Sequence, residues 1–162
     1  MEIKYKVVDN FLPTNYFKKI QSLLLDERLE WYYTDYSSYV GGKDGHSFVH
    51  VFWDSGKKTS NVLDEFNFLL EKLKVKHLMQ LRANMFTRDS VYTQSDFHVD
   101  YNNTSSTTAI LYINTNNGYT ILNKEKIKSV ENRLLVFPVN VKHATIRQTD
   151  TNRRIVLNIN YV

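Results

Sequence analysis

Two histidines and one aspartate have the residue types that a mononuclear metal site needs. His98 and Asp100 stand two apart in the segment FHVDY, and His143 follows later in the chain, just after LLVFPV. Side chains two apart in an extended strand share a face, so His98 and Asp100 can reach one ion together. Two imidazoles and a carboxylate occupy one face of a six-coordinate iron and leave the other positions open. The pattern therefore predicts a metal site at His98, Asp100 and His143.

The bland alternative is that these three residues are surface polar groups at strand ends, because a His-x-Asp pair is common by chance. The remaining histidines are weaker candidates for ligands. His46 lies in a glycine-rich stretch, His77 follows a lysine-rich helix end, and His50 lies inside a strand. We expect each of them to be a solvent-facing or a hydrogen-bonded core group and not a ligand.

A fixed cation follows the candidate ligands in the last segment of the chain. Arg153 and Arg154 open the stretch RRIVLNINYV, and a guanidinium can grip a carboxylate through two parallel hydrogen bonds. Strand alternation allows only one of them to face inward. Arg154 shares its face with polar residues at 158 and 160, whereas Arg153 shares its face with Ile155 and other apolar residues. We therefore favour Arg154 over Arg153 as the anion-binding residue.

The composition fits one small domain spanning residues 1–162. The chain has 42% hydrophobic and 14% aromatic residues, enough to build a single core. Cysteine is absent, which excludes disulfides and thiolate chemistry and fits a reducing compartment. No stretch approaches the roughly 20 apolar residues of a membrane span, so we expect a cytoplasmic protein with no membrane partner. The net charge of +4 is too small to identify a partner.

The hydrophobic pattern predicts helices first and strands afterwards. We expect a strand at 4–8, a helix from Pro13 to about Glu27, a β-prone stretch at 29–34, a strand at 47–53 and a second helix capped by Ser60. Further strands are expected at 78–87, 107–113, 118–123, 132–137, 143–147 and 153–161. This order favours an α+β, mainly β fold, a jelly roll with the N-terminal helices packed on one sheet.

The order of these parts resembles the Fe(II)- and 2-oxoglutarate-dependent oxygenases of the prolyl 4-hydroxylase type, over nearly the whole chain. FHVDY is similar to the family's metal-binding strand, and TTAILYIN and GYTIL are similar to the two strands that follow it. ENRLLVFPVNVKHAT and NRRIVLNINYV are similar to the distal-histidine segment and the cosubstrate strand. The resemblance implies a double-stranded β-helix, a cupin-like jelly roll, with iron bound by His98, Asp100 and His143.

The resemblance also implies residues for the cosubstrate. Arg154, or else Arg153, would bind the distal carboxylate of 2-oxoglutarate. Tyr112, in TAILYIN, matches a tyrosine that several prolyl hydroxylases place against the same carboxylate. As one of eleven tyrosines, Tyr112 fits a purely packed strand position equally well.

Two asparagines complete the implied cosubstrate set. Asn84, in RANMF, aligns with a strand whose polar residues often touch the cosubstrate in related enzymes. The family often has a serine two residues after the arginine, but this chain has Val156 there. Part of the usual contact set is therefore absent, and Asn158 is the candidate that would replace it.

The implied activity is hydroxylation of a C–H bond, with a peptidyl or prolyl side chain as the favoured substrate and a peptide or protein as the partner. Fe(II), 2-oxoglutarate and dioxygen would be required, with ascorbate as a candidate reductant. Two other classes stay open. A pI of 9.1 and aromatics beside basic residues also fit a nucleic-acid demethylase of the same superfamily. The third is a cupin-like binding protein that holds a structural metal such as zinc and has no turnover.

Substrate choice is expected to lie in two loops near the metal strand. The first runs from Tyr36 to His46 and is glycine-rich, so it can close over a bound chain; its candidate contacts are Tyr36, Tyr39 and Lys43. Ordinary loop polarity explains the same residues. The second loop, residues 87–96, adds Arg88 and Tyr92 as candidate gate residues.

Overall fold

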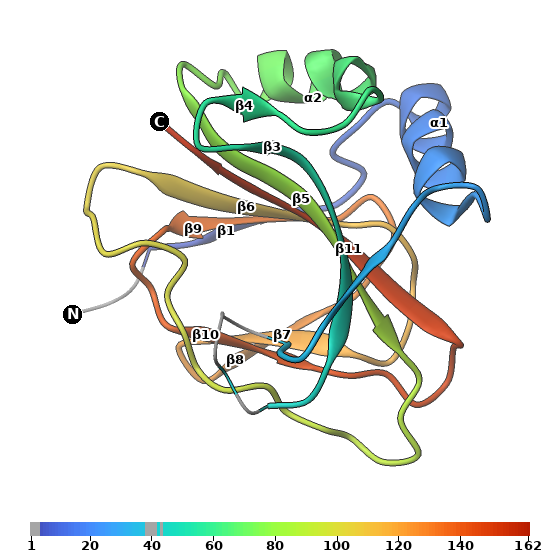
Figure 1. The fold of residues 1–162 in the computed structure, drawn as a ribbon. Coiled ribbons are helices and arrows are strands. Elements are labelled where there is room, and N and C mark those ends of the chain that lie inside the picture. The colour runs from blue at the N-terminus through green and yellow to red at the C-terminus, as the bar shows by residue number, and fades with distance from the viewer. Residues whose placement is uncertain (1–3, 38–41, 43) are drawn as a thin grey trace.

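The chain folds into two antiparallel sheets that face each other, with two helices on the outer side of the larger sheet. The computed structural model describes residues 4–37, 42 and 44–162. Figure 1 looks into the space between the sheets, with the larger one arched above the smaller and the helices above both. This is the expected α+β double-stranded β-helix with its N-terminal helices packed on one sheet.

The larger sheet has eight strands in the order β1-β9-β6-β11-β5-β3-β2, with β4 paired to β3. Its strands are β1 (Lys6–Val8), β2 (Tyr32–Thr34), β3 (Ser47–Asp54), β4 (Lys57–Lys58), β5 (Leu78–Thr87), β6 (Thr107–Tyr112), β9 (Leu134–Pro138) and β11 (Arg153–Tyr161). The smaller sheet has the order β10-β7-β8, with β7 (Tyr119–Leu122), β8 (Glu125–Lys128) and β10 (His143–Ile146). The strands predicted from Leu78 onward are confirmed to within two residues at each end.

The helices cover the outer face of the larger sheet because each carries one apolar stripe. Helix α1 (Thr14–Leu25) buries Phe17, Ile20 and Leu24, which recur at helical spacing. A 3-10 turn η1 (Leu63–Phe66) leads into α2 (Asn67–Lys72), and both pack beside α1. None of the helices in the described part of the chain is long and apolar enough to span a membrane.

Strand β11 separates two cores. Ile155, Leu157 and Ile159 point outward and join the core under the helices. Val156, between them, belongs to a second core that lies between the two sheets. Arg154 is also buried, on the inward face with Val156. The predicted division of this strand into a helix-facing side and an inward-facing side is thus confirmed.

Two local predictions are wrong. Ser60 does not cap the second helix, because its hydroxyl is hydrogen-bonded to Nε2 of His50 at 2.8 Å and no side chain caps η1. Strand β8 was not predicted, since only Ile127 of its four residues is buried and the others are charged and exposed. Asn123 and Lys124, with φ of 48° and 72°, form the tight turn that pairs β8 with β7.

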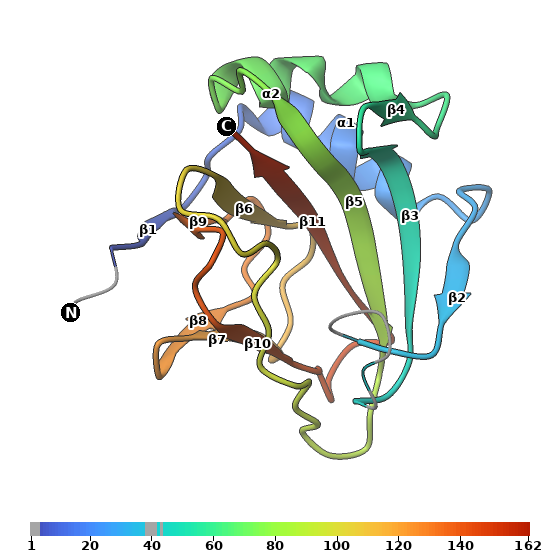
Figure 2. The same ribbon diagram turned by 60° about the vertical axis from the view of Figure 1, so that its left-hand side comes forward.

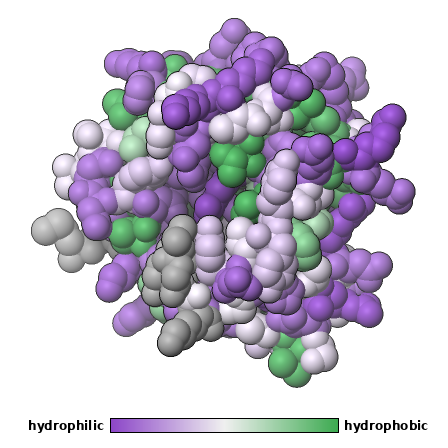
Figure 3. Space-filling view, in the orientation of Figure 1, coloured by the Kyte–Doolittle hydropathy of each residue, from purple (hydrophilic) through white to green (hydrophobic). Residues whose placement is uncertain are grey.

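Figure 3 shows the face of Figure 1, on which hydrophilic residues predominate and hydrophobic ones are scattered among them. Scattered apolar residues of this kind are normal on a globular surface and need no partner to cover them.

We expect Asn132 to contribute strongly to stability, because it ties the N-terminal segment to the turn before β9. Its side-chain oxygen accepts from the Leu12 amide at 2.9 Å, its side-chain nitrogen donates to the Leu12 carbonyl at 2.8 Å, and its own φ is 60°. Asn132→Ala loses both buried bonds and strains the backbone, so urea unfolding should show a loss of about 2–4 kcal/mol. Asn132→Gly removes the same bonds without the strain and should lose less. Equal losses for the two variants would contradict this account.

Candidate metal centre

Three ligand-type side chains meet between the sheets. Nε2 of His98 lies 3.7 Å, and Nε2 of His143 lies 3.6 Å, from the same Oδ1 of Asp100. The ligand atoms of these three residues all lie within 4.8 Å of one another. Two metal–ligand bonds of about 2 Å span up to about 4 Å, so the two His–Asp separations suit a single bound ion. The structure therefore brings together the trio whose residue types suit a metal.

Backbone pairing brings the two histidines together. The His98 amide donates to the His143 carbonyl at 3.1 Å, and the His143 amide donates to the His98 carbonyl at 3.0 Å. A second backbone bridge pairs Gln94 with Ile146. Between the two bridges the segment before His98 advances by four residues and β10 by only three, so this segment contains a bulge. The prediction that FHVDY forms a strand is therefore wrong: this bulge breaks the ladder, and only isolated bridges remain. Figure 2 shows the segment between β5 and β6 passing beside β10.

Both imidazoles present Nε2 to the centre of the trio. Nδ1 of His143 lies 3.1 Å from the Val141 carbonyl, and Nδ1 of His98 lies 3.3 Å from the Asp96 carbonyl. A carbonyl only accepts, so each Nδ1 carries the hydrogen and each Nε2 offers a lone pair. Burial, followed by the neighbouring His143, lowers the pKa of His98 to about 4. At neutral pH His98 is therefore in the uncharged form that metals bind.

The outer oxygen of Asp100 is held by two polar side chains from the larger sheet. The Thr108 hydroxyl donates to Oδ2 at 2.8 Å, and the side-chain nitrogen of Asn158 lies 3.4 Å from it. The Thr108 oxygen also lies 2.8 Å from the side-chain oxygen of Asn160. A hydroxyl has one proton, so both contacts are satisfied when the Asn160 amide turns its NH₂ toward Thr108. These bonds fix the carboxylate with Oδ1 toward the histidines.

Arg154 is a fully buried cation beside this centre. Its Nε donates to Ser129 Oγ at 2.8 Å and its Nη2 to Thr120 Oγ1 at 3.3 Å, but its Nη1 is buried with no partner. Burial lowers the pKa of Arg154 to about 10, so it remains charged at neutral pH. No carboxylate among the described residues forms an ion pair with it. A buried charge without a counter-charge costs several kcal/mol, which points to an anion as its partner.

The surroundings of Arg154 are shaped to admit its guanidinium. The guanidinium carbon lies 5.4 Å from the Phe86 ring centre and 5.8 Å from the Tyr112 ring centre. Position 118 is glycine, and a Cβ there would lie 2.9 Å from Arg154 Cδ, too close for a real contact. Tyr112 is also buried and donates its hydroxyl to Thr120 at 2.8 Å.

The other residues of the expected cosubstrate set lie in different surroundings. Arg153 points away from the inner space, with Nη2 donating to the Leu25 carbonyl at 3.0 Å. Asn84 is buried and pairs across β5 and β11 with Val156, on the inward side. Asn158, one step further along that face, contacts Asp100 and also has a buried side-chain oxygen without a partner.

The loop between β2 and β3 is tied to the smaller sheet. Arg147, which follows β10 and is buried, donates from Nη2 to Ser37 Oγ at 2.6 Å and to the His46 carbonyl. Asp44 accepts from the Ser37 amide and from the Asp96 amide, each at 3.0 Å. The loop is thereby attached to the segment that carries His98.

The candidate substrate contacts are only partly described. Tyr39 and Lys43 lie outside the described residues. Tyr36 is half-buried, and its carbonyl accepts bonds from neighbouring hydroxyls. Arg88 is exposed, and Tyr92 is 56% exposed with its ring centre 6.3 Å from that of Tyr119. The expected contacts of these residues with a substrate therefore stay predictions.

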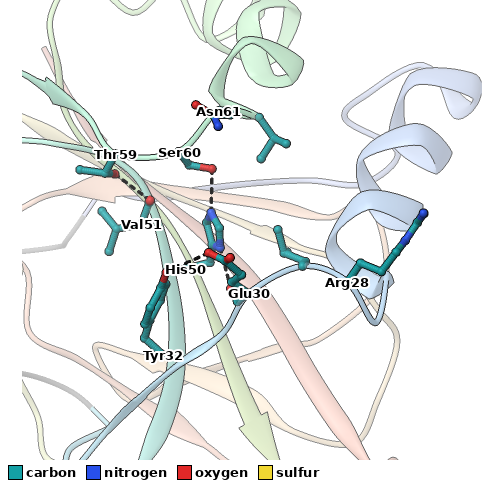
Figure 4. A pocket seen from close by; sticks show the side chains of 10 residues that line it. Arg28, Glu30, Tyr32, His50, Val51, Thr59, Ser60 and Asn61 are labelled. Atoms are coloured by element: carbon teal, nitrogen blue, oxygen red, sulfur yellow. Dashed lines mark hydrogen bonds between the residues drawn. The ribbon is translucent and has the colours of Figure 1, made fainter.

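His50 is a hydrogen-bonded core group, as expected. Figure 4 shows it between the Ser60 hydroxyl, 2.8 Å away, and the Glu30 carbonyl, 2.6 Å away. It borders a pocket of about 300 Å³ that is also lined by Arg28, Glu30 and Tyr32. Both ring nitrogens are occupied, so this histidine is structural.

Sequence reasoning missed three side chains that shape the centre: Thr108, Ser129 and Arg147. Thr108 shares the alternation of Tyr112 on β6, so the pattern could have placed it on the inward face. Ser129 and Arg147 follow strands, where the sequence carries no signal for their direction.

No protein-family model matches this sequence, and no curated protein matches it either. Solved structures do share its fold. A prolyl 4-hydroxylase from Pseudomonas putida has a TM-score of 0.71 at 13% identity, over 98% of this chain and 92% of that one.

Two further structures support the same likeness. A prolyl hydroxylase from Trichoplax adhaerens, solved in complex with a hypoxia inducible factor oxygen degradation domain peptide fragment, has a TM-score of 0.64 at 13% identity, over 97% of this chain and 83% of that one. HygX from Streptomyces hygroscopicus, with nickel, 2-oxoglutarate and hygromycin B bound, has a TM-score of 0.62 at 13% identity, over 98% of this chain and 82% of that one. At such identities the likeness establishes a shared fold.

We expect Thr108→Val to weaken metal binding about 10- to 100-fold, because it removes the hydroxyl that orients Asp100. Thr108→Ser keeps the hydroxyl and should bind metal as the parent does. Competition with a chelator for Zn(II) or Mn(II) measures both affinities. A valine variant within twofold of the serine variant would show that this hydroxyl does not support the ligand.

Proposed function

We propose that this protein is an Fe(II)- and 2-oxoglutarate-dependent oxygenase, with residues 1–162 forming one catalytic domain. The observation that carries the proposal is the combination of two features: the trio at His98, Asp100 and His143, and the buried, uncompensated charge of Arg154 on the same inward face. A binding protein with a structural metal accounts for the trio but leaves the arginine unexplained.

The donor set fits ferrous iron. Two neutral imidazoles and one carboxylate leave about half of an octahedral coordination sphere for small molecules. The carboxylate is fixed by Thr108 and both histidines by backbone carbonyls, so little reorganisation is needed when the ion binds. Zinc accepts the same ligands, so activity must be tested with a defined metal.

Arg154 is the residue that would bind the distal carboxylate of 2-oxoglutarate. Its Nη1, which has no partner, and the Thr120 hydroxyl, which accepts from Tyr112 and Arg154 and keeps its own proton, are donors that a carboxylate requires. Tyr112 would become a third donor if its hydroxyl turned from Thr120 to the carboxylate. Val156 adds no polar contact, and Asn84 and Asn158 are the polar side chains closest along the sheet toward the metal trio. We assign them to the remainder of the cosubstrate site.

The protein's part in the reaction is to position the groups and keep the site dry. When bound, iron and 2-oxoglutarate supply the oxidising chemistry, with dioxygen consumed and succinate and carbon dioxide released. Asp100 and the histidines hold their orientation, and Arg154 sets the direction of the cosubstrate. Phe86 and Phe137, buried between the sheets, exclude water. No acid-base pair among the side chains is needed.

A peptidyl side chain, with proline first, is the substrate class that we propose to test. The Trichoplax adhaerens neighbour is a prolyl hydroxylase in complex with a peptide, and this chain has the fold of that protein. Asp44, from the loop between β2 and β3, is hydrogen-bonded to Asp96, two residues before His98, and a peptide would pass beside this segment. A peptide array that gives no +16 mass shift would remove this class.

The metal assignment predicts a spectroscopic signature. Anaerobic protein with Fe(II) and 2-oxoglutarate should show a weak metal-to-ligand absorption band, and His143→Ala should abolish it. In air, the parent protein should convert 2-oxoglutarate to succinate. A band retained in the variant would remove His143 from the ligand set, and a band without succinate would favour a binding protein over an enzyme.

The two arginines give a matched pair of variants. Arg154→Gln should weaken 2-oxoglutarate binding about 100-fold, in keeping with the loss of a charge-assisted, two-pronged contact. Arg153→Gln should leave the affinity unchanged, since that guanidinium binds the Leu25 carbonyl. Calorimetry with Mn(II)-loaded protein measures both. Because Arg154 is buried, its variant is first checked for folding by circular dichroism, and Arg154→Lys provides a second version that retains the charge.

A further inference from the structure

A second cation, Arg82, reaches the inner space from β5. Its register places it opposite Asn158 of β11 and Val51 of β3, on the same side of β5 as Asn84. Asn158 is the side chain that contacts the outer oxygen of Asp100. Arg82 is therefore level with the metal trio along the sheet.

Arg82 has no partner among the described residues. Its Nε is buried and makes no hydrogen bond, and no carboxylate forms an ion pair with its guanidinium. Arg133 and Arg147 are paired with the carboxylates of Asp9 and Asp89, and Arg153 donates to the Leu25 carbonyl. A guanidinium that is partly desolvated without such compensation is unfavourable unless an anion binds it.

The two carboxylates nearest in the fold are engaged elsewhere. Asp100 directs Oδ1 to the histidines and Oδ2 to Thr108. Asp54, at the end of β3, accepts a hydrogen bond from Gln80 at 3.2 Å. Neither lies within ion-pair distance of Arg82, so the charge is available to a ligand.

Arg82 and Arg154 serve different anions. Arg154 lies opposite Phe86 in the β5–β11 register, and Arg82 lies four residues further along β5. At about 3.3 Å per residue the two positions are roughly 13 Å apart along the sheet. Arg154 is completely buried, whereas Arg82 is partly exposed. The cosubstrate occupies the deep side and the substrate must enter from the open side.

We propose that Arg82 binds an anionic group of the substrate, a carboxylate or a phosphate, and so selects substrates that carry such a group next to the C–H bond that is oxidised. This inference rests on the proposed function, and it adds the chemical class of the substrate. For a peptide, it favours an acidic or phosphorylated residue, or a free carboxyl terminus, over a neutral sequence. Geometry matters here, because guanidinium holds an oxyanion through parallel bonds in a fixed direction.

The inference can be tested without turnover. In protein labelled with ¹⁵N-arginine and loaded with diamagnetic Zn(II), the buried Arg82 Nε–H signal is assigned by its loss in Arg82→Gln. Inorganic phosphate and acetate are then titrated in the presence of saturating 2-oxoglutarate. We expect at least one of these anions to shift this signal saturably. A response to phosphate indicates a phosphate group on the substrate, and a response to acetate indicates a carboxylate. Arg82→Gln should lower the affinity for that anion at least tenfold, whereas Arg28→Gln, an exposed loss of the same charge, should not.

Two outcomes would overturn the inference. No shift with either anion would show that Arg82 has no oxyanion site. A shift produced by 2-oxoglutarate itself, with no further response to phosphate or acetate, would assign Arg82 to the cosubstrate. Failure of the proposed function has a different result. If 2-oxoglutarate does not bind, the Arg154 signals do not change when it is added. The phosphate and acetate titrations of Arg82 can then be carried out without 2-oxoglutarate.

Discussion

The centre depends on one pair of backbone hydrogen bonds, those that His98 and His143 exchange. These bonds join segments that are far apart in the chain and place both imidazoles on the inward side, with ring centres 4.3 Å apart. Asp100 then needs only the two residues of chain that follow His98 to complete the trio. Backbone hydrogen bonds do not depend on side-chain type. The backbone pairing, and not an attraction between the three side chains, therefore determines where these side chains lie.

The inward face of the larger sheet is unusual for a protein interior because it is charged. Arg154 and Arg82 both project into a region that also holds apolar residues such as Val156 and Phe86. An interior selected only for stability would replace them with hydrophobic groups of similar size. If the proposed function holds, anionic molecules would complete the electrostatics of this face, with the cosubstrate at Arg154 and the substrate at Arg82.

Much of the fold could be predicted because the later strands alternate cleanly between two environments. In β11 the apolar residues at 155, 157 and 159 marked the helix-facing side, which placed Arg154 inward. The grouping of His98, Asp100 and His143 was predicted from residue type and order, and the structure brings them together; their role as metal ligands stays a prediction. The path of the chain around His98 could not be predicted, since a bulge depends on pairing with β10. Strand β8 is held by its hairpin turn and by a single buried residue, Ile127. One apolar residue among four is too few to show the alternation that predicts a strand.

The separation of the two cores by a single strand has a consequence for how such a protein can diverge. Outward residues of β11 pack in the core under the helices, and inward residues face the space between the two sheets, so either set can change by substitution while the other stays constant. This agrees with neighbours that keep the fold at about 13% identity. Length is another matter. Inserting or deleting one residue in β11 would exchange the two faces, turning the charges toward the helices and the aliphatic residues toward the metal, so this strand should tolerate many replacements but almost no change in its number of residues.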